Sequence, residues 1–333
     1  MPIASEAPVD GRALVSVIVT AFNAEPWIER VVDSVRQQSY DRVEIVVIDD
    51  GSTDRTRELV STLGEEDRRV TLAACEHAGT AKALTAGLRR ARGEFVCLLS
   101  HDCYAVPDWL DRVVDALSAD QSVGIVRGPV LPARESEVPF YHCMVVDHDS
   151  RSFDGVCIAY RAAALDAAGR HFDEQLSRYG DDADLGWRIL ECGYRHVWLH
   201  DPTAYHEVVP RTFWSGIRTS LGVYRFALLV RRHPDLRARL GLRFLWGGRT
   251  RYASVVLVHV AAIALVAGQP QVAAGAAAGL VGVLLADGAR RKAATGLTLR
   301  DRWLAMPLER LLSGLVATYA LAYGSLRYRS LVL

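Results

Sequence analysis

The chain has 333 residues, 50% of them hydrophobic, and its 39 basic side chains equal its 39 acidic ones in number. This length allows two or three domains, and the hydrophobic content suffices for a large core and some membrane-embedded sequence. The arginines that cluster late in the chain lack an aromatic-interleaved motif, which argues against a nucleic-acid-binding protein. Six scattered cysteines without a C-x-x-C pair favour buried free thiols in a reducing cytosol over a disulfide framework.

Strand and helix patterns alternate along the first two thirds of the chain. Residues 1–13 are polar and lack an apolar signal core, so we expect a disordered lead-in and no cleaved signal peptide. We then expect strands at 14–20, 43–48, 70–75, 95–99 and 123–130, and helices from Pro26, at 79–91 and from Pro107. The segment 131–153 is expected to be rich in loops. The alternation predicts βαβ units and a mainly parallel sheet.

Carboxylates follow two of the expected strands at the point where each strand ends. The β-branched run 43–48 leads directly into Asp49 and Asp50, and Glu25 follows the first strand. Asp54 is well placed to cap the next helix, so the two aspartates before it are free for another role. Because ligands of open α/β sheets bind at the carboxyl ends of strands, this edge is the predicted ligand site.

Three segments in this order, 15–25, 43–54 and the Gly180-Asp181-Asp182 stretch, resemble the family 2 glycosyltransferases of the GT-A fold, in their membrane-anchored bacterial form. The resemblance covers roughly residues 14–207, and the expected GT-A domain spans residues 14–210. It implies an α/β, Rossmann-like GT-A domain that takes a nucleotide-sugar donor of the UDP, GDP or dTDP type. By the same resemblance, the base and ribose of the donor would be held by Thr20, Ala21, Glu25 and Asp50.

The family usually carries an Asp-x-Asp motif that binds a divalent cation on the donor diphosphate. Here the motif reads Ser100-His101-Asp102, so Ser100 replaces the first carboxylate and Asp102 is left to hold Mg²⁺ or Mn²⁺. His206 matches a position that supplies a second metal ligand in some relatives. A lone histidine after a strand is more often structural, and that alternative stays open.

In relatives, the second carboxylate of the Gly180-Asp181-Asp182 stretch is the general base, which here is Asp182. Inverting sugar transfer needs such a base to take the proton of the acceptor hydroxyl. Asp181 would orient the base, and two adjacent carboxylates raise one pKa toward the working pH. The competing Asp147-His148-Asp149 stretch is interpreted as a solvated turn, and Trp187 as core packing. The Gln-x-x-Arg-Trp motif of processive relatives is missing, which favours transfer of a single sugar.

The last third of the chain predicts membrane association. Residues 211–251 form a basic segment with leucines at helical spacing, expected to lie on anionic lipid headgroups. Residues 252–286 contain no charged residue and are expected to span the membrane as a hairpin, with both ends cytoplasmic because arginines flank it. A third apolar segment, 304–326, crosses the membrane or lies along its surface. Residues 252–333 would thus form a multi-pass region of the cell membrane beneath a cytoplasmic catalytic domain.

The main hypothesis is therefore an inverting, metal-dependent transferase that moves one hexosyl group to a membrane-associated, lipid-linked or cell-envelope saccharide acceptor. Two alternatives remain. One is a polyprenyl-phosphate sugar transferase, in which a phosphate is the nucleophile and Asp182 is needed less as a base. The other is a non-catalytic membrane scaffold that kept the fold after Ser100 replaced aspartate.

Overall fold

The computed structural model describes residues 11–136, 138, 140–150, 152–177, 179–240, 249–290 and 300–332. The chain divides into two compact units. The first unit comprises residues up to Ala133 together with Cys143–Glu207, and the second comprises Arg134–His142 together with the chain from Val208 onward. Each unit is described separately below.

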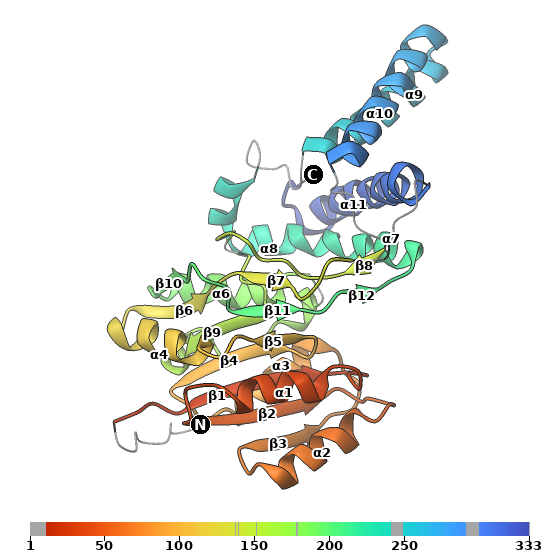
Figure 1. Ribbon diagram of the computed structural model, residues 1–333. Helices are drawn as coiled ribbons and strands as arrows, with labels where there is room; N and C mark the ends of the chain where they lie inside the picture. Colours follow the sequence, from red (N-terminus) through yellow and green to blue (C-terminus); the bar gives the residue numbers. More distant parts are fainter. Residues whose placement is uncertain are drawn as a thin grey trace. The chain divides into compact units, whose positions relative to one another are not determined.

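A seven-stranded sheet forms the centre of the first unit, with the strand order β10-β6-β9-β4-β1-β2-β3 (Figure 1). Its strands are β1 (Val15–Ala21), β2 (Val43–Asp49), β3 (Val70–Ala74), β4 (Phe95–Ser100), β6 (Val123–Arg127), β9 (Cys157–Arg161) and β10 (Arg195–Trp198). β1 runs parallel to both β2 and β4, whereas β9 runs antiparallel to β4 and β6. The prediction of an α/β fold with a mainly parallel sheet is confirmed.

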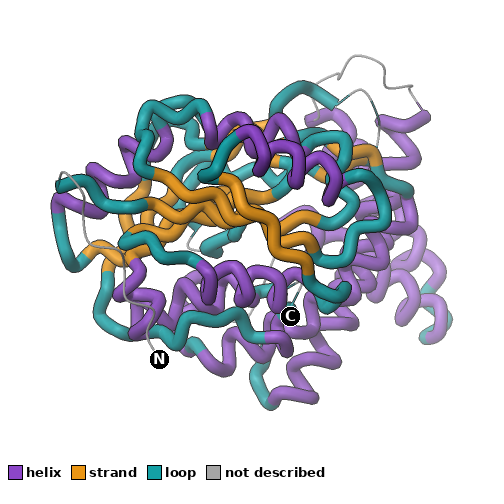
Figure 2. Tube along the Cα trace, turned by 90° about the horizontal axis from the view of Figure 1, so that it is seen from below, coloured by secondary structure: helices purple, strands orange, loops and turns teal. Residues whose placement is uncertain are grey.

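Helices cover both faces of this sheet, as Figure 2 shows from below. They are α1 (Ile28–Arg36), α2 (Thr56–Glu66), α3 (Thr80–Arg90), α4 (Trp109–Ala119), α5 (Ala162–Ala167) and α6 (Asp181–Glu191). Helices α1, α2 and α4 contribute side chains to one core with alternate residues of β1. Helix α3 packs on the opposite face, where a methyl group on Gly87 would lie 2.4 Å from Ile18.

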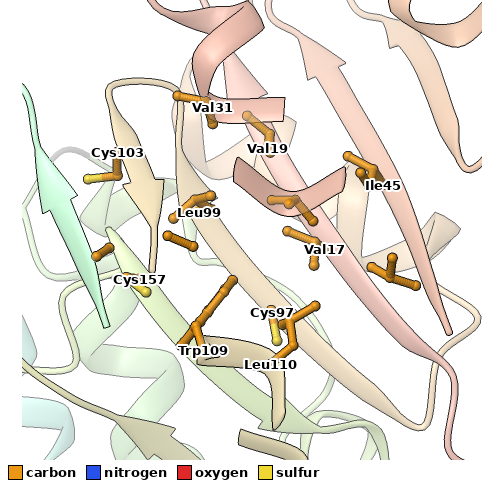
Figure 3. Packing of buried hydrophobic residues seen from close by; sticks show 14 of the residues in the cluster. Val17, Val19, Val31, Ile45, Cys97, Leu99, Cys103, Trp109, Leu110 and Cys157 are labelled. Atoms are coloured by element: carbon orange, nitrogen blue, oxygen red, sulfur yellow. The ribbon is translucent and has the colours of Figure 1, made fainter. Parts of the chain in front are cut away.

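The core explains why β1 reads as a continuous β-branched run. Val17 and Val19 point toward Val31 of α1 and Trp109 of α4 (Figure 3), and all four side chains are buried. Ile18, between the two valines, is equally buried on the other face. A strand covered on both faces needs apolar residues at every position, as is usual in parallel sheets. The ends of β1, β2 and β4 are therefore held rigidly.

A second, three-stranded sheet lies in the same unit and is formed by β5 (Cys103–Ala105), β7 (Val130–Pro132) and β11 (Ala204–His206). The sequence predicted one strand over 123–130, but the structure divides it into β6 and β7. Gly128 and Pro129 cause the break, because proline has no N–H for the ladder and a methyl group on Gly128 would lie 2.4 Å from Thr203. The segment 131–153 is mostly irregular, as expected, although β7 begins within one residue of its start.

The described part of the second unit is mainly helical. It contains the short strands β8 (Tyr141–His142) and β12 (Val209–Pro210) and the helices α7 (Phe213–Ser220), α8 (Phe226–Arg232), α9 (Arg249–Val266), α10 (Pro270–Arg290) and α11 (Met306–Tyr328). Helix α9 packs along α10, and α11 packs against α7, α8 and α9. An ion pair between the half-buried Arg211 and the buried Glu309, 3.3 Å apart, links the segment before α7 to α11.

Among the described residues, no helix is both long and apolar enough to cross a membrane. The predicted spanning hairpin at 252–286 is therefore not found, and of the two alternatives for 304–326 the membrane crossing is not found either. The physical reason is composition. Helix α9 begins with Arg249 and Arg251, and α10 consists largely of alanine and glycine, which are only weakly apolar. Residues 291–292, whose positive charge supported the expected orientation, lie outside the described residues.

The basic segment 211–251 also differs from its expected arrangement. Leu228, Leu229 and Leu236, whose helical spacing supported that expectation, are buried within the second unit. Their helical spacing is thus the spacing of core residues. Residues 241–248 of this segment lie outside the described part.

Candidate active site

The turns that follow β1 and β2 are tied together by hydrogen bonds. The Asn23 N–H donates to Ser52 Oγ at 2.9 Å, and the Glu25 N–H donates to an Asp54 carboxylate oxygen at 3.1 Å. In return, Glu25 accepts a hydrogen bond from the Arg55 N–H at 3.1 Å. Glu25 therefore lies at the predicted edge, and one of its oxygens holds the start of the next helix.

Asp49 and Asp50 have separate structural contacts. Asp49 is fully buried and accepts hydrogen bonds from the Arg57 guanidinium and a backbone N–H. Asp50 accepts hydrogen bonds from the N–H groups of Ala78, at 2.8 Å, and Gly79, at 3.1 Å, immediately before α3. An alternative role for Asp50 was to cap the following helix, α2. The structure instead places its carboxylate at the start of α3.

An aromatic pair that the sequence analysis missed lies beside Asp50. The rings of Phe22 and His77 stack with centroids 4.4 Å apart, and the His77 Nδ1 lies 3.3 Å from an Asp50 carboxylate oxygen. About half of the His77 side chain is exposed. Thr20 and Ala21 end β1 just before Phe22, and the strand register aligns Ala21 with Asp49. The arrangement offers a flat ring surface with a carboxylate beside it.

Asp102 and His206 are brought together by the pairing of β5 with β11, which aligns His206 with Cys103. Both residues are buried, and His206 Nε2 lies 3.5 Å from Asp102 Oδ2. Asp102 Oδ1 is buried and has no hydrogen-bond partner among the described residues. A buried carboxylate oxygen without a partner is costly unless it meets a ligand, and carboxylate with imidazole suits Mn²⁺. These two residues fit a divalent cation.

The predicted general base lies at the same edge of the sheet. Gly180, at φ 103°, turns the chain into α6, whose first two residues are Asp181 and Asp182. Asp182 Oδ2 accepts a hydrogen bond from the Gly155 N–H at 3.0 Å. The carbonyl oxygen of the next residue, Val156, accepts a hydrogen bond from the Ser100 N–H at 2.9 Å. Residues about 80 positions apart thus meet across the start of β9.

Burial raises the pKa of Asp181 to about 6, against opposing hydrogen bonds from backbone N–H groups, and the charge of Asp184 raises it further. The pKa of Asp182 is raised well above its ordinary value, mainly because protein surrounds its carboxylate and then because of the charges on Asp181 and Asp154. Part of Asp182 still reaches solvent. Both carboxyl groups therefore bind a proton more tightly than ordinary aspartates do.

Residues 16–142 match the family model described as Glycosyl transferase family 2. The chain is therefore similar, over this segment, to the family 2 glycosyltransferases. It is 30% identical over 145 residues to the glycosyltransferase GlyA of Streptococcus pneumoniae, which covers 43% of this chain and 21% of that protein. The chain spans between a fifth and two fifths of the length of the first curated relatives that it matches, with shares of 21%, 34% and 40%.

Two further relatives of the transferase domain cover more of the chain. The glucosyl-dolichyl phosphate glucuronosyltransferase of Haloferax volcanii is 27% identical over 236 residues, which covers 61% of this chain and 75% of that protein. The mannosyltransferase PcManGT from Pyrobaculum calidifontis, solved in complex with GDP-Man and Mn²⁺, is 25% identical with a TM-score of 0.57, covering 92% of this chain and 88% of that one. The predicted GT-A fold is confirmed.

Other side chains near Asp182 are structural. Asp184 pairs with Arg188 at 2.8 Å, and Trp187 is buried with its ring against the edge of Phe153. Core packing of Trp187, the preferred interpretation of the sequence, is therefore confirmed. Asp147 and His148 are exposed and contact each other, as expected of a solvated turn. Asp149 differs from that prediction, because it is half-buried and lies 2.8 Å from His196 Nε2.

The segment 152–155, which was not among the predicted site residues, contacts Asp182 directly. Its first two residues close the expected loop 131–153, and no predicted element covered residues 154–155. Its one signal is Gly155 two residues before a buried strand, where a glycine often marks a close approach of the backbone.

Proposed function

We propose that the protein is an inverting, metal-dependent glycosyltransferase that moves a single sugar from a nucleotide-sugar donor to a hydroxyl group of a lipid-linked or cell-envelope saccharide. The observation that carries the proposal is the convergence of Asp182 and the segment Ser100–Asp102 on residues 155–156 at one edge of the sheet. The similarity to a mannosyltransferase solved with GDP-Man and Mn²⁺ supports a donor site at this edge.

The donor would lie across the ends of β1, β2 and β4. The nucleobase stacks on Phe22 and His77 and meets the carboxylate of Asp50, beside Thr20, Ala21 and Glu25. Asp102 and His206 would hold a divalent cation, which neutralises charge on the diphosphate leaving group. Ser100 adds a hydroxyl group at this end of the site but no charge.

Asp182 performs the proton transfer in this proposal. Its carboxylate takes the proton of the acceptor hydroxyl while that oxygen forms a bond to the anomeric carbon and the bond to the donor diphosphate breaks. The hydrogen bond from Gly155 fixes one carboxylate oxygen, so the base keeps one orientation. A raised pKa makes the carboxylate a stronger base, and Asp181 supports this through its adjacent negative charge.

A lipid-linked acceptor is favoured by two observations. The Haloferax relative acts, by its name, on a glucosyl-dolichyl phosphate, and the chain spans 75% of it. In the second unit, α9 and α10 expose large apolar side chains, which are Val256, Val260, Ile263, Leu265, Val266, Val272, Val281 and Leu285. Exposed apolar surface of this kind marks an interaction site, and we propose that it contacts the surface of the cell membrane.

The test is turnover of UDP-, GDP- and dTDP-sugars by the full chain with Mn²⁺. Turnover is measured as the amount of nucleoside diphosphate released. Asp182→Asn is compared with Asp147→Asn, which removes an exposed carboxylate outside the site. We expect Asp182→Asn to lower turnover about 10²- to 10⁴-fold and Asp147→Asn to leave it unchanged. Equal turnover by Asp182→Asn and the unaltered chain would contradict the proposal.

The acceptor class is tested in the same assay. A polyprenyl-linked sugar offers a hydroxyl group, whereas a polyprenyl phosphate offers a nucleophile that is already ionised. The proposal expects stimulation by the first and strong dependence on Asp182. Stimulation by the phosphate alone, with little loss in Asp182→Asn, would favour the polyprenyl-phosphate transferase.

A further inference from the structure

Arg127 on β6 is a buried charge that the proposed reaction does not use. It is 2% exposed, and its Nη2 donates to Asp154 Oδ2 at 3.1 Å. Its Nε and Nη1 are buried and have no hydrogen-bond partner among the described residues. Burial of a guanidinium without a partner destabilises the folded state. The ion pair with Asp154 therefore offsets the desolvation of Arg127.

Asp154 belongs to a segment that is fixed against the helix of the base. The neighbouring Phe153 is fully buried and has φ 53°, a left-handed conformation that is strained for a phenylalanine. Its ring fills the space over Gly186 of α6, where an added methyl group would lie 2.3 Å from the ring. The Ser152 hydroxyl also donates to Asp154. Strain of this kind persists only where the surroundings hold the residue in place.

The segment ends at the hydrogen bond to the base. Gly155 follows Asp154 directly, and its N–H donates to Asp182 Oδ2. We propose that Asp154, held by Arg127, is a positioning residue for the transfer, because it fixes the N–H that orients Asp182 and places a second negative charge beside the base. The inference rests on the proposed function, in which Asp182 is the general base.

The charges around Asp182 support this assignment. Asp181 on α6 and Asp154 both raise its pKa, after the larger effect of burial. The buried Tyr160 on β9 faces the same cluster, since its pKa is raised by burial and by Asp182 and lowered by Arg127 and Arg188. The negative charges of Asp181 and Asp154 are thus opposed by the positive charges of Arg127 and Arg188. Removal of Asp154 should lower the pKa of Asp182, whereas removal of Arg127 should raise it.

The experiment is the pH dependence of kcat/KM for donor turnover by the full chain. Asp154→Asn removes a negative charge and leaves Arg127 uncompensated, so we expect the acid limb to move to lower pH by about one unit and kcat to fall about 3- to 10-fold. Arg127→Gln leaves Asp154 uncompensated, so its acid limb should move to higher pH. Asp147→Asn is the matched control and should not shift the limb.

Further readouts separate positioning from general damage. The affinity for the nucleotide should stay within about twofold in Asp154→Asn, because the hydrogen bonds of its side chain are to Arg127 and Ser152. Asp154→Glu should recover part of kcat. If Arg127→Gln does not fold, Asp154→Asn and Asp154→Glu decide. An unshifted limb with normal kcat in Asp154→Asn, or a parallel loss of nucleotide affinity and stability, would overturn the inference.

The activity of Asp182→Asn distinguishes failure of the proposed function from failure of the inference about Asp154. Full activity of Asp182→Asn would remove the proposed function itself. Loss of activity in Asp182→Asn together with an unaltered pH profile in Asp154→Asn would remove only the role of Asp154.

Discussion

Replacement of Asp181 by asparagine should stabilise the protein while it impairs the transfer. Asp181 is 8% exposed and its pKa is about 6, compared with an ordinary value of 3.8. The folded state therefore binds this proton more tightly than the unfolded chain does. The stability contributed by the protonated group is complete below the unfolded pKa and is lost as the pH rises through the folded pKa.

The size of the effect follows from that difference in pKa. The two values differ by about 2 units, and each unit corresponds to about 1.4 kcal/mol. Because Asp181 and Asp182 share their protons, part of the penalty remains with Asp182 after the substitution. We expect Asp181→Asn to unfold with a free energy roughly 1 to 3 kcal/mol higher than the unaltered chain at neutral pH.

The assay is urea unfolding of both proteins at several pH values between about 4 and 7. The two stabilities should converge at the acid end and separate as the pH rises through about 6. Donor turnover of the variant should fall at the same time, so that stability and activity change in opposite directions. A stability difference that does not depend on pH, or a destabilised variant, would refute the assignment of Asp181 as a buried, charged group.

Two substitutions test the packing of the site. Asp50→Ala removes the acceptor of the Ala78 and Gly79 N–H groups, and urea unfolding should show a loss of about 1 to 3 kcal/mol together with weaker nucleotide binding; unchanged values of both would contradict the contacts. Gly186→Ala forces a methyl group against the Phe153 ring, so the free energy of unfolding should fall by about 1 to 3 kcal/mol and turnover should slow. The control is Gly275→Ala on α10, where an added methyl group meets nothing within 4 Å and no stability should be lost. Equal stabilities of the two variants would exclude the clash.

The sheet could be predicted because its strands are covered on both faces. The runs that became β1, β2 and β4 are apolar at nearly every position, and they end at polar residues. The parallel pairing then places those ends at one edge, which is why the region around Asp50 and Asp102 was predicted correctly as one edge of the sheet. These features depend on local pattern and on a general rule of topology.

The rest depends on contacts between distant residues. Asp50 bonds to residues 78–79 because β2 ends beside the loop that precedes α3, and no local pattern contains that information. The same holds for Gly155 and Asp182, which are 27 positions apart. The prediction of membrane-spanning helices was not met for another reason. A run without charged residues is not apolar enough to cross a membrane when alanine and glycine compose much of it.

The most direct test of the proposed donor site is calorimetric binding of UDP, GDP and dTDP to the full chain, with and without Mn²⁺, beside Asp102→Ala. The account predicts that one nucleotide binds, that Mn²⁺ tightens this binding, and that Asp102→Ala abolishes the tightening because the buried Oδ1 is lost. Failure of all three nucleotides to bind folded protein would contradict the account and favour a scaffold. Metal-dependent binding that survives in Asp102→Ala would place the cation elsewhere.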